Sequence, residues 1–378
     1  MSFDIDDVGL AAEGRDWSDT KISSRARRDR ILPNGVVLKL MKRSNWEGCK
    51  RLFSNLALLF STAYAIYKLN IHPDIAIHNI RQWGQFELEK ILIFIPLYIS
   101  YGFQMQCLAF AGGHELHHGN AFKTKWMSAA ATFFVGTAFF EVLPHERIIH
   151  KQHHMYTMDI NRDPELTSFY SRDELEDLKF NCVPQSRYKY LKTFFNLLSY
   201  FQHRAYRLMS SCQGIATDYT GMGWSMQSPR PNKLNSVVVR DLQFWSLLQL
   251  SVYVAIFCTI GKTIQGFKNL LFWWIIPCIL GYGPINFFRN AEHAHCDMTA
   301  NQLLSTRTVE SNKIVRWLLW ETNFHAEHHA YPMVPFFNLP KLHELLNDHI
   351  KHNECKSFAS QNWQMIKKGG WIDEQNSK

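Results

Sequence analysis

The sequence lacks several features that would mark it as a common class of soluble protein. Its eight cysteines are scattered with no Cys-x-x-Cys pair, a pattern that indicates neither a disulfide framework nor a zinc finger and is typical of reduced thiols. It also lacks repeats, low-complexity tracts and nucleic-acid-binding motifs. Its first residues, MSFDIDDVGL, are polar and charged and do not resemble a cleaved signal peptide.

The net charge of the chain is moderately positive. Lys and Arg exceed Asp and Glu by 41 − 33 = 8 in 378 residues. An excess of this size suits an anionic membrane surface or an acidic protein partner. Because no nucleic-acid motif accompanies it, we expect no nucleic-acid partner.

Charged residues are missing from five apolar runs. A membrane-spanning helix needs about 20 apolar residues, and about 17 at the short end. The second, fourth and fifth runs are long enough, and the first fits when its flanking residues are counted. The sequence therefore predicts an all-α integral membrane protein with four transmembrane helices in two hairpins. The five runs are Leu52–Tyr67, Ile91–Gly113, Trp126–Phe140, Gln243–Ile260 and Asn269–Phe288.

The third run, Trp126–Phe140, holds only 15 residues. If it spanned the membrane, the histidines before it and after it would lie on opposite sides. We therefore predict that it is re-entrant or lies in the membrane interface, with its backbone hydrogen bonds kept inside a helix. Phe194–Met209 mixes apolar and basic residues, which predicts either an interfacial helix or, equally, a helix packed against the rest of the protein.

Positive charge is distributed unevenly along the chain. Lys and Arg number 11 in residues 1–51, 13 in 144–242 and 10 in 289–378, but only three in 68–90 and two in 261–268. The positive-inside rule therefore places both termini and the middle of the chain in the cytosol, where they would form a cap. We divide the chain into a cytosolic N-terminal segment (1–51), a membrane domain (52–345) and a cytosolic C-terminal tail (346–378).

The 18 histidines are clustered. Twelve fall in four stretches, which are HELHH from His114, HERIIHKQHH from His145, HAHC from His293 and HAEHH from His325. On a helix, residues three and four apart share a face. Adjacent residues are about 100° apart, so the histidine doublets would serve two neighbouring metal ions rather than one.

Nine of these histidines are our candidate metal ligands. So many clustered imidazoles would repel one another if protonated and would be costly without partners at a membrane boundary, whereas metal binding uses the neutral ring. Nine ligands exceed two closed zinc sites, and imidazole also suits iron, so a pair of iron ions fits the count better. The nine are His114, His118, His150, His153, His154, His293, His325, His328 and His329.

The other histidines and the nearby acidic residues have less specific assignments. His117, His145 and His295 either support the ligands or have a purely structural role. We prefer His293 to His295 as a ligand because acidic and amide residues flank His293. We interpret six as structural, namely His72, His78, His203, His343, His349 and His352. Six acidic residues either orient ring N–H groups or lie on ordinary surface, namely Glu115, Glu146, Asp159, Asp163, Glu292 and Glu327.

Three of the stretches resemble the histidine boxes of the membrane fatty acid desaturase and hydroxylase superfamily. They are HxxxH at 114–118, HxxHH at 150–154 and HxxHH at 325–329, with His293 ahead of the third box. The runs HKQHHMYTMDINRDPEL and NFHAEHHAYPMVPFFNLPKLH extend the resemblance to roughly residues 90–345. It implies a cytosolic cap above the membrane helices, in which the nine histidines hold two iron ions, and it implies O2 activation for attack on an unactivated C–H bond.

Some branches of this superfamily carry motifs that differ from those of this sequence. The third box begins with His325, where front-end desaturases carry Gln, and no His-Pro-Gly-Gly haem motif is present. The first box is shorter than that of acyl-CoA Δ9 desaturases. The pattern is similar to that of acyl-lipid desaturases and related hydroxylases.

The resemblance implies an O2-dependent desaturase acting on the fatty acyl chain of a lipid, with a hydroxylase of an acyl chain or another hydrophobic substrate as the alternative. It also implies an external electron donor, cytochrome b5 or ferredoxin, and the endoplasmic reticulum if the source is eukaryotic. A metal transporter or sensor is the remote alternative. A transporter should carry ionisable residues inside its spanning segments, whereas all five apolar runs lack both charge and histidine.

Overall fold

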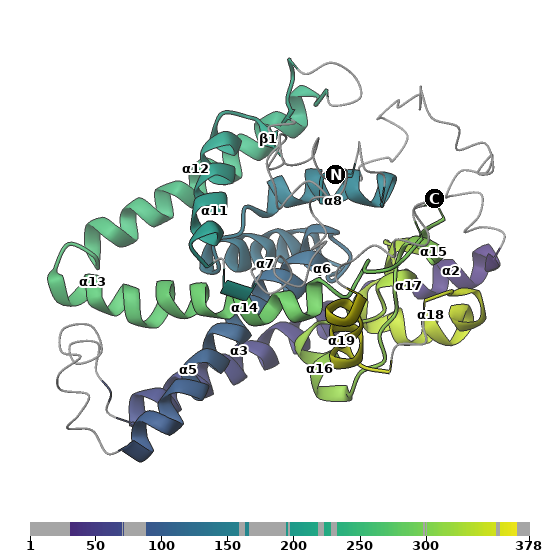
Figure 1. Ribbon diagram of the computed structural model, residues 1–378. Coiled ribbons are helices and arrows are strands. Elements are labelled where there is room, and N and C mark those ends of the chain that lie inside the picture. The colour runs from purple at the N-terminus through teal and green to yellow at the C-terminus, as the bar shows by residue number, and fades with distance from the viewer. Residues whose placement is uncertain are drawn as a thin grey trace.

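The computed structural model describes residues 31–69, 71, 88–158, 163–165, 194–195, 197–217, 223–227, 233–297, 299, 301–352 and 356–368. In these residues the regular structure is helical apart from one small sheet (Figure 1). Strands β1 (Ala216–Thr217) and β2 (Gly223–Trp224) pair antiparallel, with Ala216 opposite Trp224. The predicted all-α class is confirmed.

The helices of the described residues fall before and after this sheet. Before it lie α2 (Asn34–Leu40), α3 (Asn45–Lys68), α5 (Leu88–Cys107), η4 (Leu108–Gly112), α6 (Gly113–His117), α7 (Lys125–Ala138), α8 (Leu143–Tyr156) and α11 (Leu197–Cys212). After it lie α12 (Ser236–Thr259), α13 (Ile264–Leu270), η5 (Leu271–Ile275), α14 (Ile276–Arg289), α15 (Gln302–Ser305), α16 (Lys313–Leu318), α17 (His325–Ala330), η6 (Phe336–Asn338), α18 (Leu339–Leu346), η7 (Asn347–His349) and α19 (Phe358–Lys368).

Three helical stretches are long and apolar enough to cross a membrane, namely Glu89–His117, Ser236–Thr259 and Ile264–Arg289. They correspond to the second, fourth and fifth predicted runs. Helix α3 matches the first run and has 24 residues, but polar residues such as Arg51 and Asn55 interrupt it, and its composition falls short of that of the three candidates. The chain is therefore an integral membrane protein whose described residues hold three candidate spans, or four if the bent pair of α7 and α8 is one span, together with the long helix α3.

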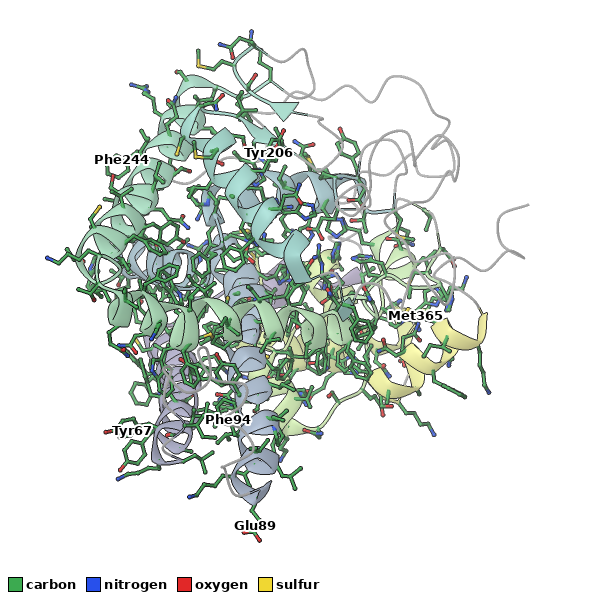
Figure 2. All side chains as sticks on the ribbon, turned by 60° about the vertical axis from the view of Figure 1, so that its left-hand side comes forward. Tyr67, Glu89, Phe94, Tyr206, Phe244 and Met365 are labelled. Carbon is green, nitrogen blue, oxygen red and sulfur yellow. The ribbon has the colours of Figure 1, made fainter. Side chains whose placement is uncertain are left out.

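These long helices form two arms (Figure 1). Helices α3 and α5 make one arm, and α12 with α13 and α14 makes the other; both extend away from α15, α17 and α18. Figure 2 places Tyr67 and Glu89 at the tip of the first arm. The arms present exposed apolar side chains, including Phe60 and Leu92 on the first and Phe257 on the second, as expected of surfaces that face lipid rather than water.

The two arms cross where glycines allow their backbones to touch. A Cβ atom added to Gly102 of α5 would lie 2.1 Å from the carbonyl oxygen of Pro277, and one added to Gly281 of α14 would lie 2.0 Å from the carbonyl oxygen of Gly102. Neither site has room for a side chain. Small residues at such crossings are typical of helix packing in membranes, where close backbone contact replaces the hydrophobic driving force.

The π-helical turn η5 sits beside this crossing and exposes carbonyl groups that tyrosines of α5 satisfy. The Tyr98 hydroxyl donates to the carbonyl of Phe272 at 2.6 Å, and the Tyr101 hydroxyl donates to that of Trp273 at 3.0 Å. Unpaired backbone carbonyls are costly in lipid. The tyrosines therefore stabilise the irregular turn and join the two arms.

Helices α7 and α8 meet at a bend of 101°. The chain turns at Phe140, whose φ is +61°, and the ring of Phe140 lies 4.5 Å from the ring of Trp274 and 4.9 Å from that of Phe201. The pair is either a broken span or a re-entrant loop by its length and composition. The third apolar run therefore ends in a sharp turn, and the prediction that it is re-entrant or lies in the membrane interface stays a prediction.

Helix α11 covers the bend. Arg204 of α11 forms an ion pair with Glu141 of the bend, and Arg207 forms one with Glu146 of α8. Of the two interpretations of Phe194–Met209, the contacts favour a helix packed against the rest of the protein. Our division of the chain at 51/52 and 345/346 stays a prediction.

Candidate metal centre

The first histidine box follows α5 without a break, through the π-helical turn η4 and the short helix α6. Two glycines allow this segment to lie deep in the protein. A Cβ on Gly112 would lie 3.3 Å from the buried ring of Trp320, and one on Gly113 would lie 3.2 Å from Leu143. This packing places the first box beside α8, which carries the second box, and beside the segment that precedes α17, which carries the third.

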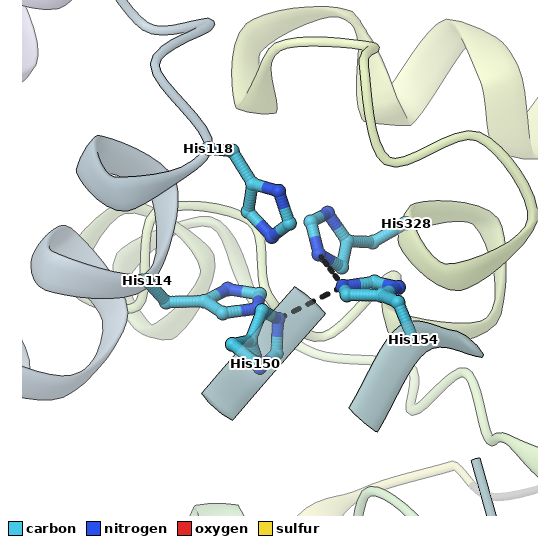
Figure 3. A group of neighbouring side chains, drawn as sticks. All are labelled: His114, His118, His150, His154 and His328. Atoms are coloured by element: carbon cyan, nitrogen blue, oxygen red, sulfur yellow. Dashed lines mark hydrogen bonds between the residues drawn. The ribbon is translucent and has the colours of Figure 1, made fainter. Parts of the chain in front are cut away.

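All nine candidate ligands come together in two groups. Within each group the ring nitrogens that could hold a metal ion lie within 4.8 Å of one another. The first group is His114, His118, His150, His154 and His328, drawn in Figure 3. The second group is His153, His293, His325 and His329.

The doublets divide between the two groups as predicted. His153 and His154 are adjacent on α8 but belong to different groups, and so do His328 and His329 on α17. Histidines four residues apart stay together, since that spacing returns to the same helix face. The histidine three residues after the first of each HxxHH box lies in the other group, so the expectation that histidines three residues apart share a face with the first is wrong here.

Within each group the rings point their Nε2 atoms at one another. The Nε2 atom of His150 lies 2.7 Å from that of His114 and 2.8 Å from that of His154. His154 and His328 approach to 3.2 Å, as Figure 3 shows. In the second group, the Nε2 atoms of His293 and His325 are 2.9 Å apart. Nitrogen ligands about 2.1 Å from one ion lie roughly 3 Å from each other, so this is the spacing of a ligand shell.

Several of the inward-pointing ring nitrogens are available to bind a metal ion. The Nε2 atoms of His118, His153 and His329 are buried and have no hydrogen-bond partner in the described part of the chain. An unpaired buried nitrogen is costly, and a metal ion removes that cost by taking the lone pair. The donor set therefore fits a pair of metal ions that prefer imidazole.

The outward Nδ1 atoms of three candidate ligands are held by acceptors. His150 Nδ1 lies 2.5 Å from Glu165 Oε1, and His153 Nδ1 lies 2.8 Å from Asp163 Oδ1. His293 Nδ1 lies 3.1 Å from the carbonyl oxygen of Ser305. An Nδ1–H group that donates outward leaves Nε2 with a free lone pair and fixes the ring orientation, which is how ligating histidines are usually held.

Burial also favours the neutral form of the third-box rings, whereas at His153 burial is outweighed by Asp163 and Glu165, which raise its pKa to about 9. Burial, followed by the neighbouring histidines, lowers the pKa of His325, His328 and His329 well below its usual value. A neutral ring is the form that binds metal. The third box is therefore ready for metal at neutral pH.

The predicted acidic partners have different surroundings. Asp163 binds His153, as expected of a residue that orients a ligand. Glu115 is fully buried, with an oxygen 3.7 Å from His328 Nδ1, and Glu292 has an oxygen 3.9 Å from His325 Nε2, so both lie near a ligand but beyond hydrogen-bond distance.

The remaining acidic candidates face away from the ligands. Glu146 is engaged by Arg207. Glu327 accepts hydrogen bonds from Thr308 and His343 on the far side of α17. Asp159 lies outside the described residues.

Glu165 was absent from our predicted set. Burial raises the pKa of this carboxyl, but His153 and Arg289 outweigh burial and lower the pKa to about 2, so that it is charged at neutral pH. The available signal was its place in NRDPEL, two residues after Asp163. The turn at Pro164 allows both carboxylates to reach the second box.

The three histidines of intermediate assignment are not members of either group. The ring of His117 lies 4.7 Å from that of His150, while its carbonyl accepts from Arg147. His145 accepts from the backbone N–H of Thr217, which ties α8 to β1. His295 occupies a turn with a φ of +59°. His117 therefore adjoins the ligands, and the contact of His145 is structural.

The histidines predicted to be structural lie outside the groups wherever they are described. His343 contacts Glu327, His352 lies 3.3 Å from Asp297, and His349 is exposed. His203 lies on α11. His72 and His78 are outside the described residues.

A helical membrane protein that gathers two groups of buried imidazoles at one end of its apolar helices is a membrane protein with a histidine-rich metal centre. Residues 90–356 match the model of the family described as fatty acid desaturase. The match covers more than half of the 378 residues, and the chain belongs to this family. It is therefore an O2-dependent oxidoreductase whose family acts on fatty acyl substrates. The comparison with curated proteins gave no match.

Proposed function

We propose that the protein is a di-iron desaturase that introduces a double bond into the fatty acyl chain of a lipid. The observation that carries this proposal is the convergence of nine imidazoles, eight of them buried and His118 half-buried, into two adjoining groups. The proposed iron ligands are His114, His118, His150, His154 and His328 for one ion and His153, His293, His325 and His329 for the other.

The chain prepares this centre through its own side chains. Glu165 and Asp163 accept the Nδ1–H protons of His150 and His153, which leaves both Nε2 lone pairs directed inward. Burial of the boxes among α6, α8 and α17 excludes water. When bound, a pair of iron ions supplies the activation of O2 for attack on a C–H bond, while the protein orients the acyl chain.

The position of the centre suits a lipid substrate. The first box directly ends the candidate span Glu89–His117, and His293 follows the candidate span Ile264–Arg289 by a few residues. An acyl chain can reach the ligands there without leaving the boundary of the bilayer. Both boxes that flank α7 contribute to the first group, which supports a re-entrant α7–α8 pair that keeps the two boxes on one side of the membrane.

Orientation and electron supply are further parts of the proposal. By the distribution of Lys and Arg, the termini and the metal centre face the cytosol. Electrons would come from cytochrome b5 or a ferredoxin docking on the cytosolic face. A eukaryotic source would place the protein in the endoplasmic reticulum.

Hydroxylation of an acyl chain or another hydrophobic substrate is the second candidate, because the same ligand set serves both reactions. The two are separated by lipid mass spectrometry of a host that expresses the wild type, with His328→Ala as the inactive comparison and the exposed His349→Ala as the matched control. We expect a product that lacks two hydrogens in the wild type and in His349→Ala only. A product with one added oxygen would replace desaturation by hydroxylation, and full activity with full iron content in His328→Ala would refute the ligand assignment.

A further inference from the structure

The N-terminal ends of α3 and α7 lie side by side on the protein surface. The side chain of Asn45 donates to the Thr124 hydroxyl at 2.7 Å, and the Thr124 backbone N–H donates to the Asn45 side-chain oxygen at 2.9 Å. A Cβ on Gly48 would lie 2.7 Å from the ring of Phe122, so the two segments are in close contact beyond this pair. Two helices from different parts of the chain thus begin at one place.

Each helix begins with an exposed tryptophan. Trp46 is the second residue of α3 and is 72 % exposed, and Trp126 is the second residue of α7 and is 70 % exposed. Exposed indole rings are uncommon in water but are enriched at the membrane–water interface, where the ring meets both apolar chains and polar head groups. The paired tryptophans therefore indicate an interface position.

Four cationic residues lie within four positions of the two tryptophans in the sequence. Lys42 and Arg43 precede Asn45, while Lys123 and Lys125 flank Thr124, and all four are exposed. Lys50 and Glu47 form a pair of their own at 3.9 Å. The tryptophan–lysine patch, formed by Trp46, Trp126, Lys42, Arg43, Lys123 and Lys125, therefore carries four cations that Glu47 does not neutralise.

The exposed face of α3 indicates where this patch would lie relative to the bilayer. Trp46, Phe53 and Phe60 are seven residues apart and therefore share one face, which continues to the exposed Tyr67. From Trp46 to Tyr67 is 67 − 46 = 21 residues, or about 31 Å of helix, and the hydrocarbon core of a bilayer is about 30 Å thick. The exposed aromatic face of α3 is therefore about as long as the hydrocarbon core is thick, and Trp46 stands at one end of it.

The patch lies at the end of α3 that faces the metal centre. Arg51, one turn further along α3, binds Glu321 at 3.1 Å, and Glu321 lies four residues before His325. The four cations therefore lie at the same leaflet of the bilayer as the metal centre.

We propose that the tryptophan–lysine patch binds the phosphate-bearing head groups of anionic phospholipids in that leaflet. The cations pair with the phosphates, and the two indoles insert at the head-group boundary. This surface goes beyond the proposed oxidation reaction and does not depend on it. The bound lipids hold the starts of α3 and α7, and with them the first box, at a constant depth.

The test titrates the full-length protein in uncharged detergent with dioctanoyl phosphatidylserine, dioctanoyl phosphatidylcholine or inorganic phosphate and measures the thermal midpoint. Phosphatidylserine should raise the midpoint saturably and more than the other two probes. The variant Lys42→Gln, Arg43→Gln, Lys123→Gln, Lys125→Gln should need at least about tenfold more phosphatidylserine for half the effect. The matched control carries Lys233→Gln, Arg240→Gln, Lys262→Gln and Lys341→Gln, four exposed cations elsewhere, and should behave as the wild type.

The tryptophans are tested separately in lipid nanodiscs. Lipids brominated near the head group should quench the tryptophan fluorescence of the wild type more than that of the double variant Trp46→Phe, Trp126→Phe. Equal quenching of both, an equal shift with inorganic phosphate, or an equal loss in the control variant would overturn the proposal. Unchanged lipid selectivity in the patch variant, together with lost turnover with an acidic electron-donor protein, would identify a protein-docking surface instead.

Discussion

At the scale of single residues, the metal centre depends on the acceptors behind the ligands as well as on the ligands themselves. Glu165 illustrates this, because its contact with His150 Nδ1 directs the opposite nitrogen toward His114 and His154. The histidine boxes were visible in the sequence because their spacing is local. Glu165 was not, because a turn brings it to α8.

Glu165→Gln should weaken iron binding by about 10- to 100-fold, since a neutral amide holds the Nδ1–H group of His150 less strongly than a carboxylate does. Iron content measured during titration with a chelator would show the change. The exposed Glu310→Gln is the matched control. Identical iron retention in both variants would mean that Glu165 does not orient the ligand.

His343→Ala should lower stability without removing a ligand. Glu327 is fully buried and contacts His343 and Thr308, so loss of one partner should reduce the free energy of unfolding by about 1–3 kcal/mol. Thermal unfolding and iron content measured on the same sample separate the two effects. Loss of iron in the folded variant would instead assign His343 to the metal centre.

At the scale of helices, local pattern predicted where the elements lie but not how they meet. The apolar runs located α5, α12 and α14, because length and composition decide which helices can lie in lipid. The crossing of α5 and α14 depends on Gly102 and Gly281, which are 179 residues apart in sequence and touch only in the folded protein. The bend after Ala138 likewise depends on packing of Phe140 against Trp274.

Gly281→Ala should destabilise the protein by about 1–3 kcal/mol, because the added methyl group would push the backbones of α5 and α14 apart. The thermal midpoint is the measurement. Gly35→Ala is the control, since a Cβ at Gly35 meets nothing within 4 Å. A Gly281→Ala midpoint equal to that of the control would show that the crossing can relax at no cost.

At the scale of the whole molecule, the buried histidine cluster couples folding to pH. Burial lowers the pKa of His325, His328 and His329 well below its usual value, which is about 6.5 in an unfolded chain. Below pH 6.5 the unfolded chain takes up protons that the folded protein excludes, so stability should fall as pH decreases. Metal binding has the same sign, because only the neutral ring binds.

We therefore expect the thermal midpoint and the iron content to decrease together between pH 7.5 and about pH 5.5. Differential scanning fluorimetry and iron analysis of samples from one preparation would measure both. Iron-depleted protein should show the same direction of change, since the cost of protonating buried rings remains. A midpoint that rises or stays constant below pH 6.5 would contradict buried neutral histidines.

The sequence by itself was enough to predict the candidate metal ligands and the stretches that are candidate membrane spans. Helical spacing within a box and the length of an apolar run are local properties, so the nine candidate ligands and the candidate spans could be read from them. Only the tertiary structure decided how the histidines divide into two groups, which carboxylates hold the Nδ1 atoms of His150 and His153, and that α7 and α8 meet at a bend of 101°. These features depend on contacts between segments far apart in the chain, and packing, rather than local spacing, determines such contacts.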